Sequence, residues 1–155
     1  RAGRTSDKHL LVLGDGPLRG VCEDYAKDLQ NVSFLGNRPN VWEFLRLADY
    51  FVSSSKAEGM PNAALEALAS GLPVLLSDIP SHQEILSLSP KAGRLFDLDD
   101  STSFMQAIDD LVNTPGLDTN ARTLVETYFS ADIMSAHYQR LYRQLICELS
   151  EERPV

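Results

Sequence analysis

Residues 48–78 read ADYFVSSSKAEGMPNAALEALASGLPVLLSD, and this stretch decides the fold. Its apolar runs over Tyr50–Ser55 and Val74–Asp78 predict two buried strands, and Asn62–Ser70 repeats apolar residues at helical spacing. Gly71 and the proline two positions later end that helix, because glycine adopts the left-handed conformation there and proline cannot continue a helix. A strand, a crossover helix and a second strand form a unit whose strands are parallel.

The same alternation continues on both sides of this unit. Further strands are predicted at Leu10–Gly14, Asn31–Gly36 and Arg94–Phe96, and further helices at Pro17–Leu29, Asn40–Ala48 and Ser81–Leu86. After Asp97 the pattern is all-helical: Ser101–Val112 capped by Ser101, a turn over Asn113–Asn120, then Ala121–Tyr128 and Ala131–Leu149. The predicted class is therefore α/β, a Rossmann-like parallel sheet with helices on both faces and a helical C-terminal tail.

Length and charge limit the possible functions. The chain has 155 residues, enough for one domain, and its 22 acidic against 14 basic residues give a net charge of −8. A general nucleic-acid or anionic-membrane binder needs a dense positive field, so neither class is expected. Two cysteines without a CxxC pair favour a reducing, cytoplasmic compartment. The chain begins with Arg1 rather than Met, so we expect a piece of a longer protein.

Ligands of such folds bind at the carboxyl ends of the strands. There the backbone N–H groups of Asn62, Ala63 and Ala64 have no partner within their predicted helix, and the helix dipole favours an anion beside them. Gly59 gives the preceding loop freedom to present its amides, and Glu58 stands at its mouth. This segment suits a phosphorylated sugar or nucleotide, although Glu58 can also be read as an ordinary surface acid.

Glu66 is the only charged residue between Gly59 and Ser77. Its helix is otherwise apolar, and a carboxylate in apolar surroundings needs a hydrogen-bond partner. Because helical side chains lean toward the N-terminus, Glu66 can reach back to the strand ends and accept hydrogen bonds from ligand hydroxyls. The alternative is a glutamate on a solvated stripe of the helix.

Other patterns carry weaker signals. Gly14, Asp15 and Gly16 form a strand-to-helix turn, but no acid suited to a ribose follows them, so a nicotinamide-binding fingerprint is incomplete. Asp15 either lines the cleft or caps the next helix, and its position favours the cap. His82 lies in a strand-end loop, where it either touches a ligand or packs locally. Scattered histidines without ligand spacing predict no metal site.

Taken together, the ordered motifs resemble one known family. They are GDGP at 14–17, VSFLG at 32–36, ADYFVSSS at 48–55, EGMPNAALEALASGLPV at 58–74, SDIPSHQEIL at 77–86 and YFSADIMSAHYQRLY at 128–142. The chain resembles the C-terminal, donor-binding domain of GT4-type retaining glycosyltransferases, the glycosyl transferases group 1 family, which have the GT-B fold. The two acids of the central motif, Glu58 and Glu66, stand in the family's E-x7-E arrangement.

The resemblance implies roles for these positions. Glu66 would bind the ribose hydroxyls of a nucleotide-diphosphate sugar, and Glu58 would act at the donor sugar as the catalytic carboxylate. Asn37 and Arg38 would lie in the loop that contacts the base. Donor sugar and diphosphate would meet the loop and helix start, at Gly59, Met60, Pro61, Asn62, Ala63 and Ala64. Gly14, Asp15, Gly16 and His82 would line the cleft.

The resemblance also implies what lies outside this chain. Members transfer a sugar to a hydroxyl with retention at the anomeric carbon, often without a bound metal or other cofactor. The basic pair that clamps the diphosphate would precede Arg1, and the acceptor, a glycan or lipid-linked molecule, would bind a missing N-terminal domain. Any membrane contact, at the inner face, would belong to that half, and the chain alone would be inactive. The alternatives are a non-catalytic nucleotide-sugar-binding module and another GT-B enzyme, such as a nucleotide-sugar epimerase.

Overall fold

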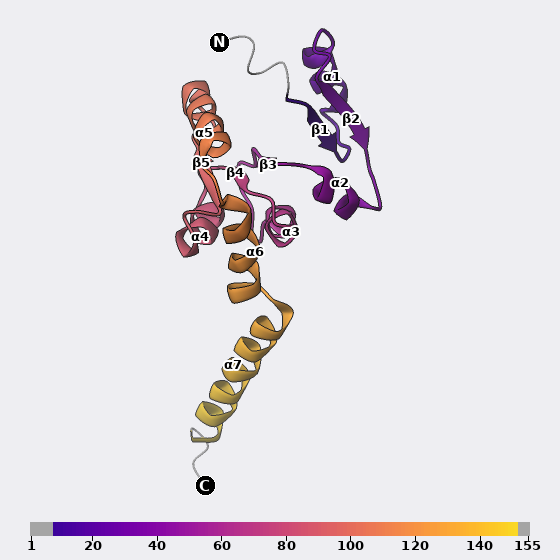
Figure 1. Cartoon of the computed structure of the whole chain (residues 1–155). Coiled ribbons are helices and arrows are strands. Elements are labelled where there is room, and N and C mark those ends of the chain that lie inside the picture. The colour runs from indigo at the N-terminus through magenta and orange to yellow at the C-terminus, as the bar shows by residue number, and fades with distance from the viewer. Residues whose placement is uncertain (1–7, 152–155) are drawn as a thin grey trace. The chain divides into compact units, whose positions relative to one another are not determined.

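The computed structural model describes residues 8–151 and divides the chain into two compact units, Arg1–Phe44 and Leu45–Val155. Strands and helices alternate through the first two thirds of the chain, and helices alone follow (Figure 1). The predicted α/β class with parallel strands and a helical C-terminal part is confirmed. Within residues 8–151, five strands form two parallel sheets, β1-β2 and β3-β4-β5.

The first unit is built around two strands and one helix. β1 (Leu10–Leu13) and β2 (Val32–Gly36) pair in parallel, with Leu10 opposite Val32 and Leu13 opposite Gly36. α1 (Arg19–Ala26) connects them, and α2 (Val41–Leu47) follows β2. α1 begins two residues after Pro17, because Gly16–Leu18 form a turn in which the Arg19 amide donates to the Gly16 carbonyl at 3.1 Å.

The second unit contains the three-stranded sheet, with β4 at its centre. Its elements are β3 (Phe51–Ser53), α3 (Asn62–Ala69), β4 (Val74–Ser77), α4 (Pro80–Leu88), β5 (Gly93–Phe96), α5 (Ser101–Asn113), α6 (Leu117–Tyr128) and α7 (Ala131–Glu151). Every residue of β4 is buried, as expected for a parallel strand covered on both faces.

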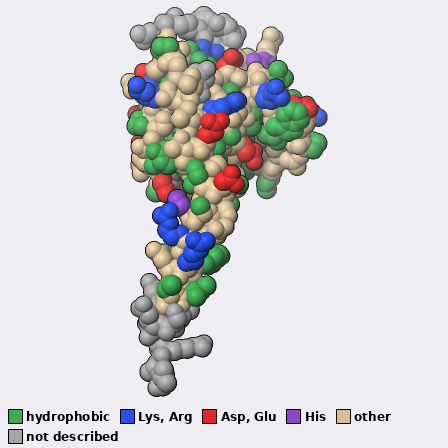
Figure 2. Space-filling model, turned by 60° about the horizontal axis from the view of Figure 1, so that its bottom comes forward, with side chains coloured by type: hydrophobic (Ala, Val, Ile, Leu, Met, Phe, Trp, Pro, Cys, Tyr) green, Lys and Arg blue, Asp and Glu red, His purple; other side chains and the backbone are tan. Residues whose placement is uncertain are grey.

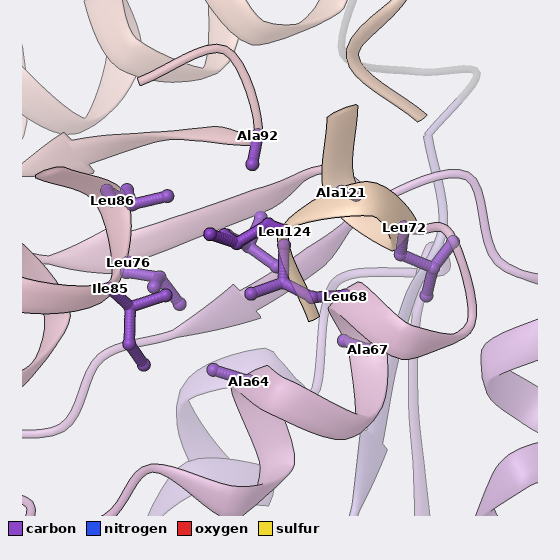
Figure 3. Close-up of a cluster of buried hydrophobic side chains, with 11 residues drawn as sticks. Ala64, Ala67, Leu68, Leu72, Leu76, Ile85, Leu86, Ala92, Ala121 and Leu124 are labelled. Carbon is purple, nitrogen blue, oxygen red and sulfur yellow. The ribbon is translucent and has the colours of Figure 1, made fainter. Parts of the chain in front are cut away.

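Two hydrophobic clusters cover the two faces of β4. Val74 and Leu76 join the larger cluster, in which α3, α4 and α6 supply buried side chains such as Leu68 and Leu124 (Figure 3). Leu75 points the other way, into the smaller cluster formed with α5 and β5. This alternation follows from the two-residue period of a strand. It fixes β4, and therefore its carboxyl end, between two packed layers.

Helix ends also differ from the sequence prediction in α5 and α6. The cap of α5 is Asp100, whose carboxylate accepts the Thr102 amide at 2.8 Å, and not Ser101. α6 begins at Leu117, inside the stretch predicted as a turn, because Gly116 takes a left-handed φ of 75° and Leu117 is buried. Within residues 8–151, no helix is long and apolar enough to cross a bilayer.

α7 contacts α6 and exposes most of its length. Large hydrophobic side chains recur along it at helical spacing, beside basic ones (Figure 2). The exposed hydrophobic residues are Met134, Tyr138, Leu141, Tyr142, Leu145 and Ile146.

Candidate functional site

The loop after β3 holds a short chain of hydroxyl contacts that ends on Glu58. The Ser55 hydroxyl donates to Glu58 Oε1 at 2.7 Å, and Ser53 Oγ lies 3.2 Å from Ser55 Oγ. Glu58 is exposed, so its carboxylate remains open to a ligand while one of its oxygens is held. Gly59 and Met60 are exposed beside it.

The start of α3 offers fewer free amides than the sequence suggested. The Asn62 amide donates to the Met60 carbonyl at 2.9 Å, so the turn before the helix uses it, and the prediction that it is unpaired is wrong. The amides of Ala63 and Ala64 have no protein acceptor among the described residues. Pro61 is buried and anchors this end of the helix. Two amides are therefore available to an anion here.

Glu66 lies on the face of α3 that is exposed to solvent. The buried face of the same helix carries Ala64, Ala67 and Leu68. No protein group of residues 8–151 forms a hydrogen bond with the Glu66 carboxylate. The alternative, a glutamate on a solvated stripe of the helix, is therefore confirmed, and apolar surroundings for this carboxylate are wrong, because only one side of α3 packs on the core. A solvated carboxylate is available for ligand hydroxyls.

The end of β4 lies beside the loop that carries Glu58. The Ser77 hydroxyl donates to the Ser55 carbonyl at 2.5 Å, which ties the residues after β3 to β4. His82, at the start of α4, is fully buried, and its Nδ1 lies 2.8 Å from the Ser77 carbonyl. Gln83 Nε2 donates to Asp78 Oδ1 at 2.7 Å. His82 therefore belongs to the site as a buried neighbour and not as an exposed lining residue.

In the first unit, Asp15 organises the turn after β1. Its carboxylate accepts the Gly16 amide at 2.8 Å and lies 3.2 Å from Arg19 Nη1. α1 has no side-chain cap, so the expected capping by Asp15 is wrong. Arg19 Nε also donates to Glu23 at 2.7 Å, and this hydrogen bond, followed by those with Asp15, raises the pKa of Arg19.

Gly14 and the loop after β2 lie at the carboxyl ends of the paired strands of this unit. Gly14 has a φ of 112° and its amide donates to the Gly36 carbonyl at 2.9 Å. Gly36 is buried with a φ of 67°, and an added Cβ there would meet Arg19 Nη1 at 2.9 Å. Asn37 and Arg38 follow it and are exposed.

Each unit thus brings some of the expected residues together. Glu58 and the start of α3 share one end of the second unit, whereas Gly14–Gly16 and Asn37–Arg38 lie in the first. An open depression of about 670 Å³ lies at the opposite ends of β3 and β4, next to Tyr50 and Pro73, and so away from the candidate site. No three His, Cys, Asp or Glu side chains within the described part of the chain are placed to hold a metal ion.

Three residues that shape these sites were not predicted from the sequence. Ser55 and Ser77 connect the two strand ends. Arg19 pairs with Asp15, and its guanidinium lies beside Gly36 at the end of β2. The serines lie in a run of common residues, and the contact between them spans 22 positions, so no local signal exposes it. Arg19 is a basic residue just after a glycine-rich turn, and this position was a sequence signal for its contact with that turn.

Comparison with known proteins gives one family and several relatives. A sequence model of the glycosyl transferases group 1 family matches residues 1–114. The putative glycosyltransferase EpsF of Bacillus subtilis is 44% identical over 72 residues, which make up 44% of this chain and 19% of EpsF. The UDP-Gal:alpha-D-GlcNAc-diphosphoundecaprenol alpha-1,3-galactosyltransferase of Escherichia coli is 33% identical over 106 residues, 66% of this chain and 27% of that protein. The matched part of the chain thus spans less than a third of either relative.

Solved structures share the fold. Sucrose-phosphate synthase from Thermosynechococcus elongatus superimposes with a TM-score of 0.76 and 25% identity, over 90% of this chain and 39% of that protein.

Proposed function

Because the chain belongs to the glycosyl transferases group 1 family, we propose that it is the C-terminal, donor-binding domain of a GT4-type retaining glycosyltransferase. Its parallel α/β architecture, which matches GT-B glycosyltransferase structures, supports this. The observation that carries the proposal is the arrangement of backbone amides and carboxylates around the start of α3. The amides of Ala63 and Ala64 have no acceptor within residues 8–151, and in the sequence they lie between the exposed carboxylates of Glu58 and Glu66.

The proposed division of labour follows from the chemistry of these groups. Backbone N–H groups at a helix start bind diphosphate oxygens, and carboxylates accept hydrogen bonds from hydroxyls. Ala63 and Ala64 would hold the diphosphate, Glu66 the ribose, and Glu58 the donor sugar. Asn37 and Arg38 would contact the base through their loop.

The proposed reaction exchanges one bond at the anomeric carbon. The bond to the diphosphate oxygen breaks with its electron pair going to the diphosphate. The acceptor hydroxyl then attacks the same face, and its proton goes to the departing phosphate oxygen. Positive charge develops on the sugar, and the Glu58 carboxylate would stabilise that charge. No metal is required in this scheme, because helix amides and basic side chains neutralise the leaving group.

The remaining parts of the reaction belong to the whole protein in this proposal. The acceptor would be a glycan or a lipid-linked sugar bound by an N-terminal domain, in the cytoplasm or at the inner face of the membrane. The name of the Escherichia coli relative specifies a lipid diphosphate acceptor for that protein.

Calorimetric titration of the chain with UDP, GDP and ADP, and with their glucose or mannose conjugates, tests the donor site. We expect one nucleotide series to bind, and Glu66→Gln to weaken it about tenfold, which corresponds to one lost hydrogen bond to a charged group. Glu126→Gln, an exposed glutamate on α6, is the matched control and should bind as wild type. Equal affinities of wild type and Glu66→Gln contradict the ribose assignment. Transfer by the full-length protein that survives Glu58→Ala overturns the role of Glu58.

A further inference from the structure

The buried pair Ser77 and His82 is not explained by packing. Both side chains are fully buried at the end of β4. A carbonyl only accepts, so His82 Nδ1 carries the hydrogen that it shares with the Ser77 carbonyl at 2.8 Å. The other ring nitrogen, Nε2, is buried and has no hydrogen-bond partner among residues 8–151. Leucine would fill the same space without an unsatisfied polar atom, so the imidazole serves another purpose.

The hydrogen bonds of this pair run in one direction, toward Glu58. The Ser77 hydroxyl has a single hydrogen and donates it to the Ser55 carbonyl at 2.5 Å. Its oxygen, 3.3 Å from His82 Nδ1, is then left to accept. The Ser55 hydroxyl in turn donates to Glu58 Oε1 at 2.7 Å. The Ser77 hydroxyl thus holds the backbone of Ser55, and the Ser55 hydroxyl holds the carboxylate.

These hydrogen bonds end in the loop that carries Glu58, which little packing holds in place. Residues 56–60 are all exposed, so packing does not fix the loop. The Ser77–Ser55 and Ser55–Glu58 bonds connect the exposed carboxylate to the rigid, fully buried end of β4.

We infer that Ser77 and His82 are positioning residues, which hold the Ser55–Glu58 loop so that the Glu58 carboxylate faces the donor sugar. The inference rests on the proposed function. His82 fixes the turn from β4 to α4 through the Ser77 carbonyl, and Ser77 passes that constraint to the loop. A role confined to packing of the turn would leave the loop and the sugar contact unchanged when the Ser77 hydroxyl is removed.

Ser77→Ala gives the cleanest test, because it deletes the hydroxyl and keeps the carbonyl that His82 binds. Trypsin cleavage after the exposed Lys56, followed by mass spectrometry, should be about tenfold faster in Ser77→Ala, while hydrogen exchange of the β4 amides stays as slow as in wild type. Ser87→Ala is the matched control, because its hydroxyl donates to the Glu84 carbonyl within α4, and it should change neither.

A second readout measures the sugar contact separately from the nucleotide. The affinity gained by UDP-glucose over UDP, or by GDP-mannose over GDP, should fall about tenfold in Ser77→Ala while the affinity for the diphosphate alone stays constant. His82→Leu should behave in the same way. In His82→Asn, the affinity gained from the sugar should return to its wild-type value, because the asparagine amide N–H replaces the Nδ1 donor.

The outcomes separate the two proposals. Wild-type cleavage after Lys56, or an unchanged gain in affinity from the sugar in Ser77→Ala, overturns the positioning role while the donor site stands. Failure of the wild-type chain to bind any of the UDP, GDP and ADP series overturns the proposed function, and the role toward the sugar with it.

Discussion

Replacement of Gly93 by alanine should separate β4 from β5. Gly93 opens β5 opposite Val74, and an added Cβ would lie 2.3 Å from the Val74 carbonyl oxygen and 2.6 Å from its Cγ2. Ordinary contact needs roughly 1 Å more. β4 is buried on both faces and cannot move aside, so β5 must shift and stretch its ladder.

The expected cost combines two effects. Overpacking costs about 1–3 kcal/mol, and one weakened ladder hydrogen bond costs about 1 kcal/mol. A loss of about 2–4 kcal/mol corresponds to a fall in melting temperature of roughly 5–15 °C for a chain of this size.

Urea unfolding and calorimetry of Gly93→Ala measure this loss. The matched control is Gly20→Ala in α1, where an added Cβ meets no atom within 4 Å. Alanine in a helix should stabilise the first unit by about 0.5–1 kcal/mol. The reasoning fails if Gly93→Ala unfolds at the same urea concentration as wild type, because the close strand contact would then be relieved at no cost.

Three further substitutions test the packing and the helix ends, each by urea unfolding. Leu68→Ala should lower the free energy of unfolding by about 3 kcal/mol, because Leu68 is fully buried. Leu88 is 42% exposed, so Leu88→Ala should lower it by less than half as much. Equal losses would contradict the assigned core. Gly71→Ala should cost about 1–2 kcal/mol, since its φ of 86° strains any residue with a Cβ, and an unchanged midpoint would contradict this. Asp100→Ala should cost about 1 kcal/mol through loss of the bond to the Thr102 amide, and Asp100→Asn should retain most of the stability.

Local chemistry made the centre of the fold predictable. The end of α3 follows from Gly71, whose amide donates to the Leu68 carbonyl at 2.9 Å while the Leu72 amide donates to Ala67 at 3.0 Å. These two bonds complete the helix end that a left-handed glycine permits. The buried strand β4 was equally clear, because its continuous apolar run fits only a strand covered on both faces.

Tertiary contacts decided what the sequence left hidden. Pro115 and Gly116 indicated a turn, but burial of Leu117 against α5 and β5 extends α6 over residues that local signals assigned to the turn. In the candidate site, Glu66 could be singled out from the sequence, because it is the only charged residue between Gly59 and Ser77. The bond between Ser77 and Ser55 depends on two strand ends meeting in space, which no window of sequence reveals.

The two faces of α3 have a consequence for how such a domain can change. Ala67 and Leu68 are committed to the core, whereas Glu66, between Leu65 and Ala67 in the chain, faces solvent. Under the proposed function, substitutions on the outer face should alter ligand choice with little change in the free energy of unfolding, because these positions do not pack in the core. Libraries that vary only the outward positions of α3 and its preceding loop should retain a folded majority, so the proposed donor specificity can be varied without first restoring stability.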